Sequence, residues 1–404
     1  MLSPTQALRR ILAALSDLSP LPPERVPLAG VIGRALAEDV RAPSDLPPFD
    51  ASTMDGYALR AADARRASAR LPVAFEVFAG RPAPGPLPAG ACCRIATGAP
   101  LPPGADAVEM QEEAHRSGRD VLFARAAERW RFVRRRGSDL ASGAVGLIRG
   151  TVLDPGAIGL AASLGRAELR VFRRPRVAIL PTGDELASPQ GAAAEPGLIL
   201  ESNGYAMAAA VLDAGAVPLL LPRAEDSAAS LAAALEAARG CDALVTTGGT
   251  QAGPRDLLRA ALSAAGARLV RWRVAIRPAG SFTFGRWDRA AVFGLPGTPG
   301  AALVSFEVFV RPVLRAMAGL PGAGRPVIVA RLASAQSKPA ALTVYTRVRL
   351  EPRRSGLVAV PLSRVPGALA SLASQDGLAI LPVGRDRMRR GSTVEVIVTR
   401  PPAT

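Results

Sequence analysis

The segment ALVTTGGTQAGPRDLL, residues 243–258, carries the clearest pattern for binding a small anion. An apolar strand pattern runs into Gly248 and Gly249, and a helix pattern follows them. Glycines at such a turn let backbone N–H groups approach an anion, and the N-terminus of the next helix favours negative charge. The segment matches neither the Walker A motif nor a Gly-x-Gly-x-x-Gly fingerprint, so it supports neither a nucleotide triphosphatase nor a dehydrogenase. A plain tight turn is the alternative interpretation.

Acidic side chains stand near the ends of several predicted strands in the same half of the chain. Asp184 and Glu185 follow the strand pattern RVAILPTG, Asp226 precedes a helix pattern, and Asp256 follows the glycine turn. Each alone could simply cap a helix or complement its dipole. Because ligands of open α/β sheets bind at the carboxyl edge of the strands, the carboxylates together favour a site there for a cation and a phosphate.

Two arginines in the segment RWRVAIRP could hold an anion. Arg273 and Arg277 are four residues apart in a predicted strand, so their side chains should lie on one face. A guanidinium group suits bidentate binding of phosphates and other oxyanions. A solvated basic strand face is the alternative.

Short polar side chains crowd into residues 46–59, LPPFDASTMDGYAL, where Asp55 precedes a glycine. In a second segment, RIATGAPLPPGADAVEMQEE, Thr97 lies at the end of a predicted strand. Such density of short polar residues is typical of a capped loop. The residue types alone therefore assign no ligand to either segment.

The elements that must position these residues differ along the chain. Alternating strand and helix patterns over residues 175–317 predict a parallel sheet covered by helices. A helix is predicted over residues 4–18 with Ser3 as its N-cap. Short strands separated by Pro and Gly predict a β-rich module over residues 71–110, and further strands from Val327 onward predict a second β domain.

The composition excludes several classes of protein. The formal net charge of +16 comes almost wholly from arginine, because Lys338 is the only lysine among 404 residues. The charge could attract nucleic acid or a phosphorylated ligand, or it could reflect a general replacement of Lys by Arg. We favour the second interpretation, since no nucleic-acid module is recognisable. One histidine, His115, cannot make a His-rich metal site, and three cysteines make no disulfide framework, which fits a reducing cytosol. No signal peptide or apolar run of membrane-spanning length is found.

Several of these segments, in this order, resemble the molybdopterin molybdenumtransferase family, which includes MoeA and the C-terminal domain of gephyrin. PPFDASTMDGYAL resembles the family pattern Pro-x-Phe-Asp-x-Ser-x-Met-Asp-Gly-Tyr-Ala, and TGAPLPPGADAVEMQEE resembles Thr-Gly-Ala-Pro-x-Pro-x-Gly-Ala-Asp. Further similar stretches are VRRRGSDL, LPTGDEL, ESNGYAM, TTGG, WRVAIRP and GLPGTP. The resemblance spans essentially the whole chain.

The resemblance implies an α/β multidomain fold in four parts. A MogA-like α/β molybdopterin-binding domain with a parallel-rich sheet would combine residues 1–20 with 176–322. An elongated β-rich domain for linkage and dimerisation would combine residues 21–45 with 142–175. An inserted β-rich domain would span residues 46–141, and a C-terminal β-barrel would span residues 323–404.

The resemblance also implies a cytoplasmic enzyme of molybdenum cofactor biosynthesis. It would insert molybdate into adenylyl-molybdopterin with Mg²⁺ and release AMP. The family is usually dimeric, with a site between subunits, and a molybdoenzyme or the upstream adenylyltransferase is a candidate protein partner. Neither a nucleic acid nor a membrane is expected as a partner.

Site residues are implied by matching positions. The implied catalytic residues are Asp55, Glu185, Asp226 and Asp256, and the last three would also hold the metal. The implied cofactor-binding residues are Thr97, Asp139, Asp184, Ser202, Asn203, Gly248, Gly249, Arg273 and Arg277. Of these, Asp55, Thr97 and Asp139 would face the α/β site of the partner subunit.

Three positions depart from the family pattern where an anion would be held. Gln251 stands where a serine is common, Gly280 replaces a second basic residue, and Ala301 lies in the segment where a hydroxyl is lost. The alternative function is therefore a non-catalytic paralogue that binds or delivers molybdopterin or the finished cofactor. A nucleic-acid-binding protein is a third hypothesis, suggested by net charge alone. The sequence does not distinguish molybdate from tungstate.

Overall fold

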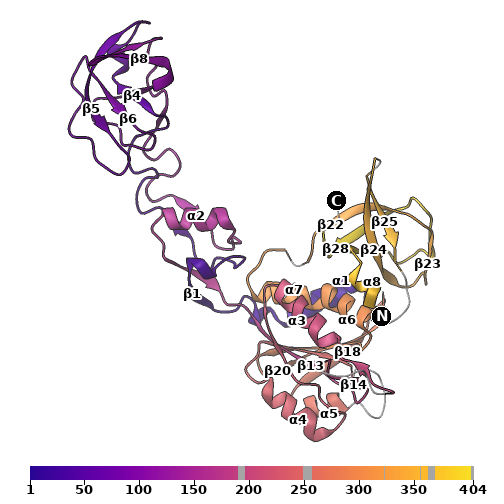
Figure 1. The fold of residues 1–404 in the computed structure, drawn as a ribbon. Coiled ribbons are helices and arrows are strands. Elements are labelled where there is room, and N and C mark those ends of the chain that lie inside the picture. The colour runs from indigo at the N-terminus through magenta and orange to yellow at the C-terminus, as the bar shows by residue number, and fades with distance from the viewer. Residues whose placement is uncertain (190–195, 249–256, 323, 355, 363–368, 402–404) are drawn as a thin grey trace. The chain divides into compact units, whose positions relative to one another are not determined.

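The computed structural model describes the chain except for residues 190–195, 249–256, 323, 355, 363–368 and 402–404 (Figure 1). The chain forms two compact units. The larger unit contains residues 1–37, 150–153 and 169–404, and the smaller unit contains residues 38–149 and 154–168. The four parts predicted from the sequence divide the chain more finely than these two units, so their boundaries stay a prediction.

A six-stranded sheet lies at the centre of the larger unit. Its strands are β13 (Arg176–Pro181), β16 (Val217–Leu220), β17 (Ala243–Thr247), β18 (Arg268–Arg273), β20 (Ser281–Trp287) and β21 (Ala290–Leu295). The strand order is β16-β13-β17-β21-β20-β18. The first four strands run parallel, and β20 and β18 add antiparallel pairings at one edge. The prediction of a parallel-rich sheet is confirmed, and the antiparallel edge is an addition to it.

Helices cover both faces of this sheet (Figure 1). One face packs against α1 (Pro4–Ala14), α3 (Asn203–Asp213), α6 (Pro299–Ser305) and α7 (Arg311–Met317), and the other against α4 (Ala228–Ala237) and α5 (Leu257–Ala264). Val177 and Ile179 of β13 enter the first core, whereas Ala178 and Leu180 enter the second. A strand buried on both faces reads as a continuous apolar run, which is why RVAILP predicts it well.

The N-terminal helix begins where the sequence predicts. Ser3 accepts a hydrogen bond from the backbone N–H of Gln6, and the Gln6 side chain accepts one from Ser3 in return. This reciprocal capping box satisfies two backbone donors at the helix start. The helix ends at Ala14, earlier than predicted, and a 3-10 turn over Ser16–Leu18 continues it.

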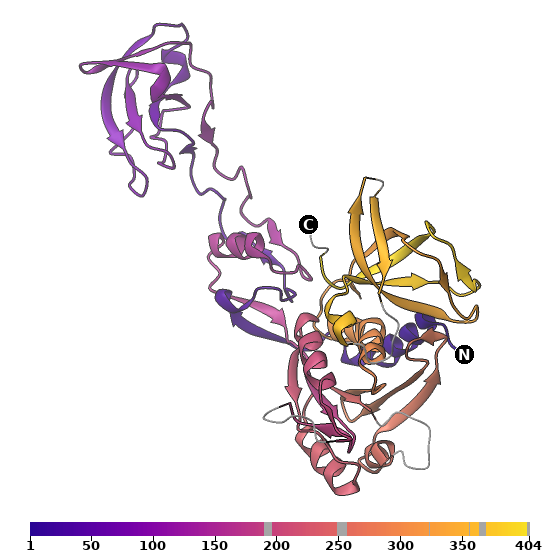
Figure 2. The same ribbon diagram turned by 45° about the vertical axis from the view of Figure 1, so that its right-hand side comes forward.

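The C-terminal part of the larger unit is a closed β-barrel, as predicted. Its strands are β22 (Val327–Leu332), β24 (Thr343–Arg353), β25 (Gly356–Pro361), β26 (Gly377–Leu381) and β28 (Thr393–Val398). The barrel closes because β24 pairs with both β25 and β26, and Figure 2 shows the orange and yellow strands curling round on themselves. A short strand, β19 (Ile276–Arg277), pairs in parallel with the start of β24 and so joins the barrel to the α/β part.

Shorter elements complete the larger unit. A π-helix over Phe306–Val310 connects α6 to α7. The remaining elements are β1 (Pro23–Pro27), β12 (Glu168–Phe172), β14 (Leu186–Ala187), β15 (Ile199–Leu200), β23 (Gln336–Ser337), β27 (Arg387–Met388) and α8 (Leu369–Ala373). Among the described helices, none is long and apolar enough to cross a membrane.

The smaller unit contains a second six-stranded sheet, of order β7-β4-β6-β5-β9-β8. Its strands are β4 (Gly56–Leu59), β5 (Arg70–Val77), β6 (Cys92–Ile95), β7 (Ala107–Met110), β8 (Ala114–Ser117) and β9 (Asp120–Phe123). Further elements are β2 (Val40–Arg41), β3 (Ala51–Ser52), β10 (Val133–Arg134), β11 (Val145–Leu147) and α2 (Pro155–Ser163). This sheet confirms the predicted β-rich module. A Cβ on Gly56 would lie 2.0 Å from the carbonyl oxygen of Glu109, so the β4–β7 pairing requires glycine there.

Candidate active site

Carboxylates gather where β13 and β16 end. Asp184 and Glu185 follow β13, and Asp226 lies between β16 and α4. The backbone N–H of Asp226 donates a hydrogen bond to Oδ1 of Asp184 at 3.0 Å. The structure thus brings Asp184 and Asp226 together at the carboxyl edge of the parallel strands, where the sequence predicts a site.

The pKa of Asp226 shows that the three carboxylates interact. Burial raises this pKa, the negative charges of Asp184 and Glu185 raise it further, and the nearby Arg223 only partly offsets them. Like charges held together favour a bound cation, because the cation relieves their repulsion. Within the described residues, no group of three or more His, Cys, Asp or Glu side chains is already arranged as a metal site. Asp256, the third predicted metal ligand beside Glu185 and Asp226, lies outside the described residues.

The carboxyl ends of β17 and β21 meet at Gly248. Its N–H donates to the carbonyl of Leu295 at 3.3 Å, so this N–H is already paired rather than directed at an anion. The glycine is required because φ is +92° and a Cβ would lie 2.6 Å from the carbonyl oxygen of Thr182. The Gly248 N–H is therefore used between the two strands, and the assignment of Gly248 as a cofactor-binding residue stays a prediction. Gly249 and Gln251 lie outside the described residues.

The start of α3 forms a polar corner beside this loop. The Asn203 side chain donates from Nδ2 to the carbonyl of Gly297 at 2.6 Å, while its Oδ1 is buried without a partner among the described residues. Ser202 precedes α3 but makes no capping bond with its side chain. Instead the buried Glu201, which the sequence reasoning missed, accepts a bond from the N–H of Gly204 at 2.7 Å. Within the described part of the chain, Asn203 Oδ1 is therefore an acceptor without a donor.

Arg273 and Arg277 do not share a strand face, contrary to the prediction. Arg273 ends β18, which pairs with β20 in the α/β sheet, whereas Arg277 belongs to β19, which pairs with β24 of the barrel. The predicted strand breaks at Val274 and Ala275, because a bond from the Thr343 N–H to the Ala275 carbonyl at 2.9 Å draws the chain toward the barrel. Arg273 therefore belongs to the α/β sheet, whereas Arg277 lies beside the barrel.

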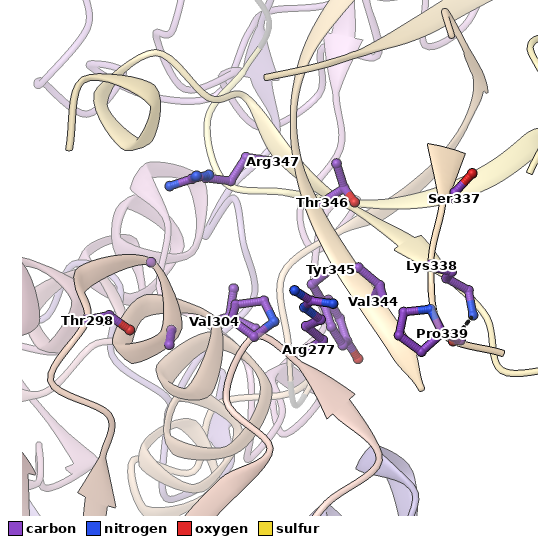
Figure 3. A pocket seen from close by; sticks show the side chains of 13 residues that line it. Arg277, Thr298, Val304, Ser337, Lys338, Pro339, Val344, Tyr345, Thr346 and Arg347 are labelled. Atoms are coloured by element: carbon purple, nitrogen blue, oxygen red, sulfur yellow. Dashed lines mark hydrogen bonds between the residues drawn. The ribbon is translucent and has the colours of Figure 1, made fainter. Parts of the chain in front are cut away.

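Arg277 instead lines a pocket of about 230 Å³ between the α/β part and the barrel (Figure 3). The lining residues come from β19, from the start of α6 and from the barrel: Arg277, Pro278, Thr298, Gly300, Ala301, Val304, Ser337, Lys338, Pro339, Val344, Tyr345, Thr346 and Arg347. Three of them are cationic, and none is acidic. Burial lowers the pKa of Lys338 and of Arg347, which shows that both charges are partly removed from water. Two partly desolvated cations, with the exposed Arg277 at the same pocket, suit an anionic ligand.

Sequence reasoning missed the barrel side of this pocket. Arg347 belongs to a strand pattern and Lys338 to the segment before it, and neither stretch offered a chemical motif. Their approach to Arg277 depends on the β19–β24 pairing. One signal was available, since Lys338 is the only lysine in the chain. Of the departures from the family pattern, Ala301 lines the pocket and Gly280 lies outside it.

The three predicted residues of the smaller unit fall into two contacts. Asp55 Oδ1 accepts bonds from the N–H of Thr97 at 2.7 Å and from its hydroxyl at 2.9 Å. These two bonds, the backbone one first, lower the pKa of Asp55. Asp139 forms an ion pair with Arg134. Arg134 lies opposite Ala51 in the antiparallel pairing of strands β10 and β3. The motifs around residues 51–55, 97 and 134–139 therefore meet in the smaller unit.

Comparison with known proteins covers the same segments. Three family models match: the MoeA N-terminal region (domain I and II) over residues 2–165, a probable molybdopterin binding domain over 178–316, and the MoeA C-terminal region (domain IV) over 329–399. Molybdopterin molybdenumtransferase 2 of Mycobacterium tuberculosis is 39% identical, over 93% of this chain and 94% of that protein. Molybdopterin molybdenumtransferase of Bacillus subtilis is 35% identical, over 93% and 90%. A crystal structure of the molybdopterin biosynthesis moeA protein from Pyrococcus horikosii is similar with a TM-score of 0.82 and 32% identity, over 97% of this chain and 98% of that one.

Proposed function

This chain belongs to the molybdopterin molybdenumtransferase family, and we propose from that premise that it inserts molybdate into adenylyl-molybdopterin and releases AMP. It is a transferase of molybdenum cofactor biosynthesis. The observation that carries the proposal is the pocket lined by Arg277, Lys338 and Arg347. The test is whether purified protein releases AMP from adenylyl-molybdopterin only when molybdate is present.

The cationic pocket is the proposed site of the oxyanion. Molybdate is a small dianion, and three positive side chains around one cavity match its charge. These groups are already in place before the reaction, so they would stabilise negative charge without reorganising. Ala301 removes a hydroxyl from the lining, but the cations remain. No observation among the described residues favours the alternative of a non-catalytic paralogue.

The pterin substrate is proposed to bind beside this pocket. Gly297, whose carbonyl accepts the bond from Asn203, is followed directly by Thr298, which lines the pocket. The polar corner at α3 and the oxyanion pocket are therefore joined by one loop. Asn203 Oδ1 would then accept a bond from the pterin ring system, and Ser202 and Gly248 would border it. The two substrates would then lie next to each other.

The carboxylates Asp184, Glu185 and Asp226 are proposed to hold Mg²⁺. Carboxylate oxygens are the ligands that Mg²⁺ prefers, and the raised pKa of Asp226 reports the crowding of negative charge that a cation would relieve. When bound, Mg²⁺ would neutralise charge on the phosphate oxygens as AMP departs. Asp256 is proposed as a further ligand from its position in the sequence.

Replacing Asp226 with Asn is expected to raise thermal stability at neutral pH while lowering the affinity for Mg²⁺ at least about tenfold. The folded protein disfavours the charged form of Asp226, so a neutral side chain of the same shape removes a cost. Because the pKa of Asp226 is raised, acidification of the wild type should begin to weaken Mg²⁺ binding at a higher pH than it would if this carboxylate had an ordinary pKa. Calorimetry and Mg²⁺ titration check both effects.

Glu225→Gln is the matched control, since Glu225 is exposed and adjacent but pairs with Arg223. It should leave Mg²⁺ affinity unchanged. If Asp226→Asn binds Mg²⁺ as tightly as the wild type, the assignment of this metal ligand is wrong.

A homodimer with a shared active site is also proposed. Exposed apolar side chains at Leu212, Val217 and Leu219 lie on α3 and on β16, an edge strand of the sheet. A group of exposed apolar side chains beside an open strand edge is a common place for contact with another chain. Asp55, Thr97 and Asp139 of one subunit would then complete the α/β site of the other.

Mixing two inactive variants tests the shared site. Asp55→Ala and Asp226→Ala, each inactive alone, should recover about half of wild-type activity in mixed dimers that carry one tag on each variant, because every mixed dimer has one intact site of two. The activity is measured after purification through different tags. An absence of recovery, with mixed dimers demonstrated, would show that the two residues act in one subunit.

The cytoplasm is the proposed location. Cys92, Cys93 and Cys241 are free and buried, which fits a reducing compartment. The proposed protein partners are the upstream adenylyltransferase or a receiving molybdoenzyme, which would accept the product directly. Cell fractionation and copurification test these two points.

A further inference from the structure

Lys338 is the single lysine among 50 basic residues. Lys and Arg carry the same charge, so the general preference for Arg in this sequence predicts an arginine at position 338 as well. A lysine is retained most readily where a guanidinium group cannot do the same work. The two differ in that an ammonium group is a compact point charge, whereas a guanidinium group is a planar fork.

The ammonium group of Lys338 ties together a turn at the edge of the pocket. Nζ donates to the carbonyl oxygen of Pro339 at 3.2 Å and to that of Leu342 at 2.8 Å (Figure 3 marks the first contact). The next residue, Thr343, begins β24 and pairs with Ile276 of β19. The Lys338 side chain thus fixes the turn from which β24 reaches β19 and Arg277.

An ammonium group carries three N–H donors, and these two carbonyls use two of them. Lys338 lines the pocket, yet it forms no ion pair with a carboxylate among the described residues. The residue is only 8% exposed, so its charge is held largely out of water. The acidic residue that acts on its charge is Asp386, whose effect is smaller than that of burial. A desolvated cation without a carboxylate partner is satisfied best by an anion.

We propose that Lys338 is a specificity-determining ligand of the oxyanion: two of its N–H groups fix the turn over Pro339–Leu342, and the third binds an oxygen of the anion in the pocket. The identity of this anion as molybdate rests on the proposed function. Arginine would not replace lysine here, because a guanidinium group directs its donors within one plane. Three bonds in tetrahedral directions require the ammonium group.

The proposal is tested first by direct binding of molybdate to the full chain, without the pterin, using calorimetric titration. Lys338→Met and Lys338→Arg should each weaken binding about tenfold, the loss of one bond to a charged group. Arg353→Lys, an exposed position paired with Glu351 on the hairpin of β24 and β25, should leave binding unchanged. Wild-type affinity in Lys338→Met, or full affinity in Lys338→Arg, would overturn the proposal.

A second measurement uses the wild-type protein and so does not depend on whether a variant folds. Lys338 carries the only side-chain amine, and amine-reactive labelling followed by mass spectrometry reports on it alone, apart from the N-terminus. Molybdate should slow labelling of Lys338 with a half-maximal concentration equal to its Kd, and the N-terminus should label at an unchanged rate. Binding of molybdate without protection of Lys338 would refute this inference and leave the proposed function standing. Absence of molybdate binding would refute both.

Discussion

Arg347→Met is expected to weaken molybdate use about ten- to hundredfold, as judged by kcat/KM for molybdate. Arg347 is a half-buried pocket residue on β24, and burial lowers its pKa, so its charge lies in a poorly hydrated position. Hydrogen bonds to charged groups in such positions are stronger than bonds in water. Methionine keeps the length and the apolar stem but removes every donor. The loss should fall on molybdate use and leave the affinity for adenylyl-molybdopterin nearly unchanged.

Arg349→Met is the control for this prediction. Arg349 lies two residues further along β24, on the same side of the strand, but it is exposed and does not line the pocket. Its replacement should change kcat/KM for molybdate by less than about twofold. Equal losses in the two variants would show that the general positive charge of the barrel matters, rather than the pocket.

Arg311→Met is expected to destabilise the larger unit by about 3–5 kcal/mol. Arg311 is 3% exposed on α7 and donates from Nε to the buried Glu307 at 2.7 Å, and it also pairs with Asp213 at the end of α3. Removing the guanidinium group would leave Glu307 buried with only Arg325 as its partner. Arg325 stands directly before the barrel, so the same network fastens the linker between the two parts of this unit.

Calorimetric unfolding at several pH values measures this loss. Burial raises the pKa of Asp213, but the charges of Arg311 and Arg325 outweigh it and leave that pKa lowered. A carboxylate whose pKa is lowered in the folded state stabilises the fold at pH values above 3.8, which is its pKa in the unfolded chain. This stabilisation is lost as the pH falls through the lower pKa of the folded state. Part of this acid dependence should vanish in Arg311→Met. Arg353→Met, which breaks an exposed pair with Glu351, should cost only about 0–1 kcal/mol. A similar small cost for Arg311→Met would contradict the structural role of the network.

Local patterns in the sequence predicted the elements that depend on local physics. Ser3 caps α1 because its side chain bonds within three residues, and β13 reads as a strand because both of its faces are buried. Asp184 and Asp226 could be placed together because parallel strands end at one edge. Each inference needed only a short segment and the alternation of strands and helices.

Features that depend on distant segments could not be read in the same way. The apolar run LVRWRVAI predicts one strand, yet Val274 and Ala275 divide it because the second piece pairs with the barrel. The sequence did not predict the antiparallel edge, because β20 and β21 are joined by Asp288 and Arg289 alone and no glycine indicates a turn between them. The pocket unites Arg277 with Lys338 and Arg347, which are 61 and 70 positions further along the chain. No spacing rule connects residues so far apart.

A single-turnover assay tests the central claim most directly. Purified protein is mixed with adenylyl-molybdopterin and Mg²⁺, with or without molybdate, and both AMP release and molybdenum incorporation are followed. The account predicts that the two rise together, that both require molybdate, and that both fall sharply in Arg347→Met. Tight binding of the pterin with no AMP release at any molybdate concentration would contradict it, and would identify the chain as a binding member of its family.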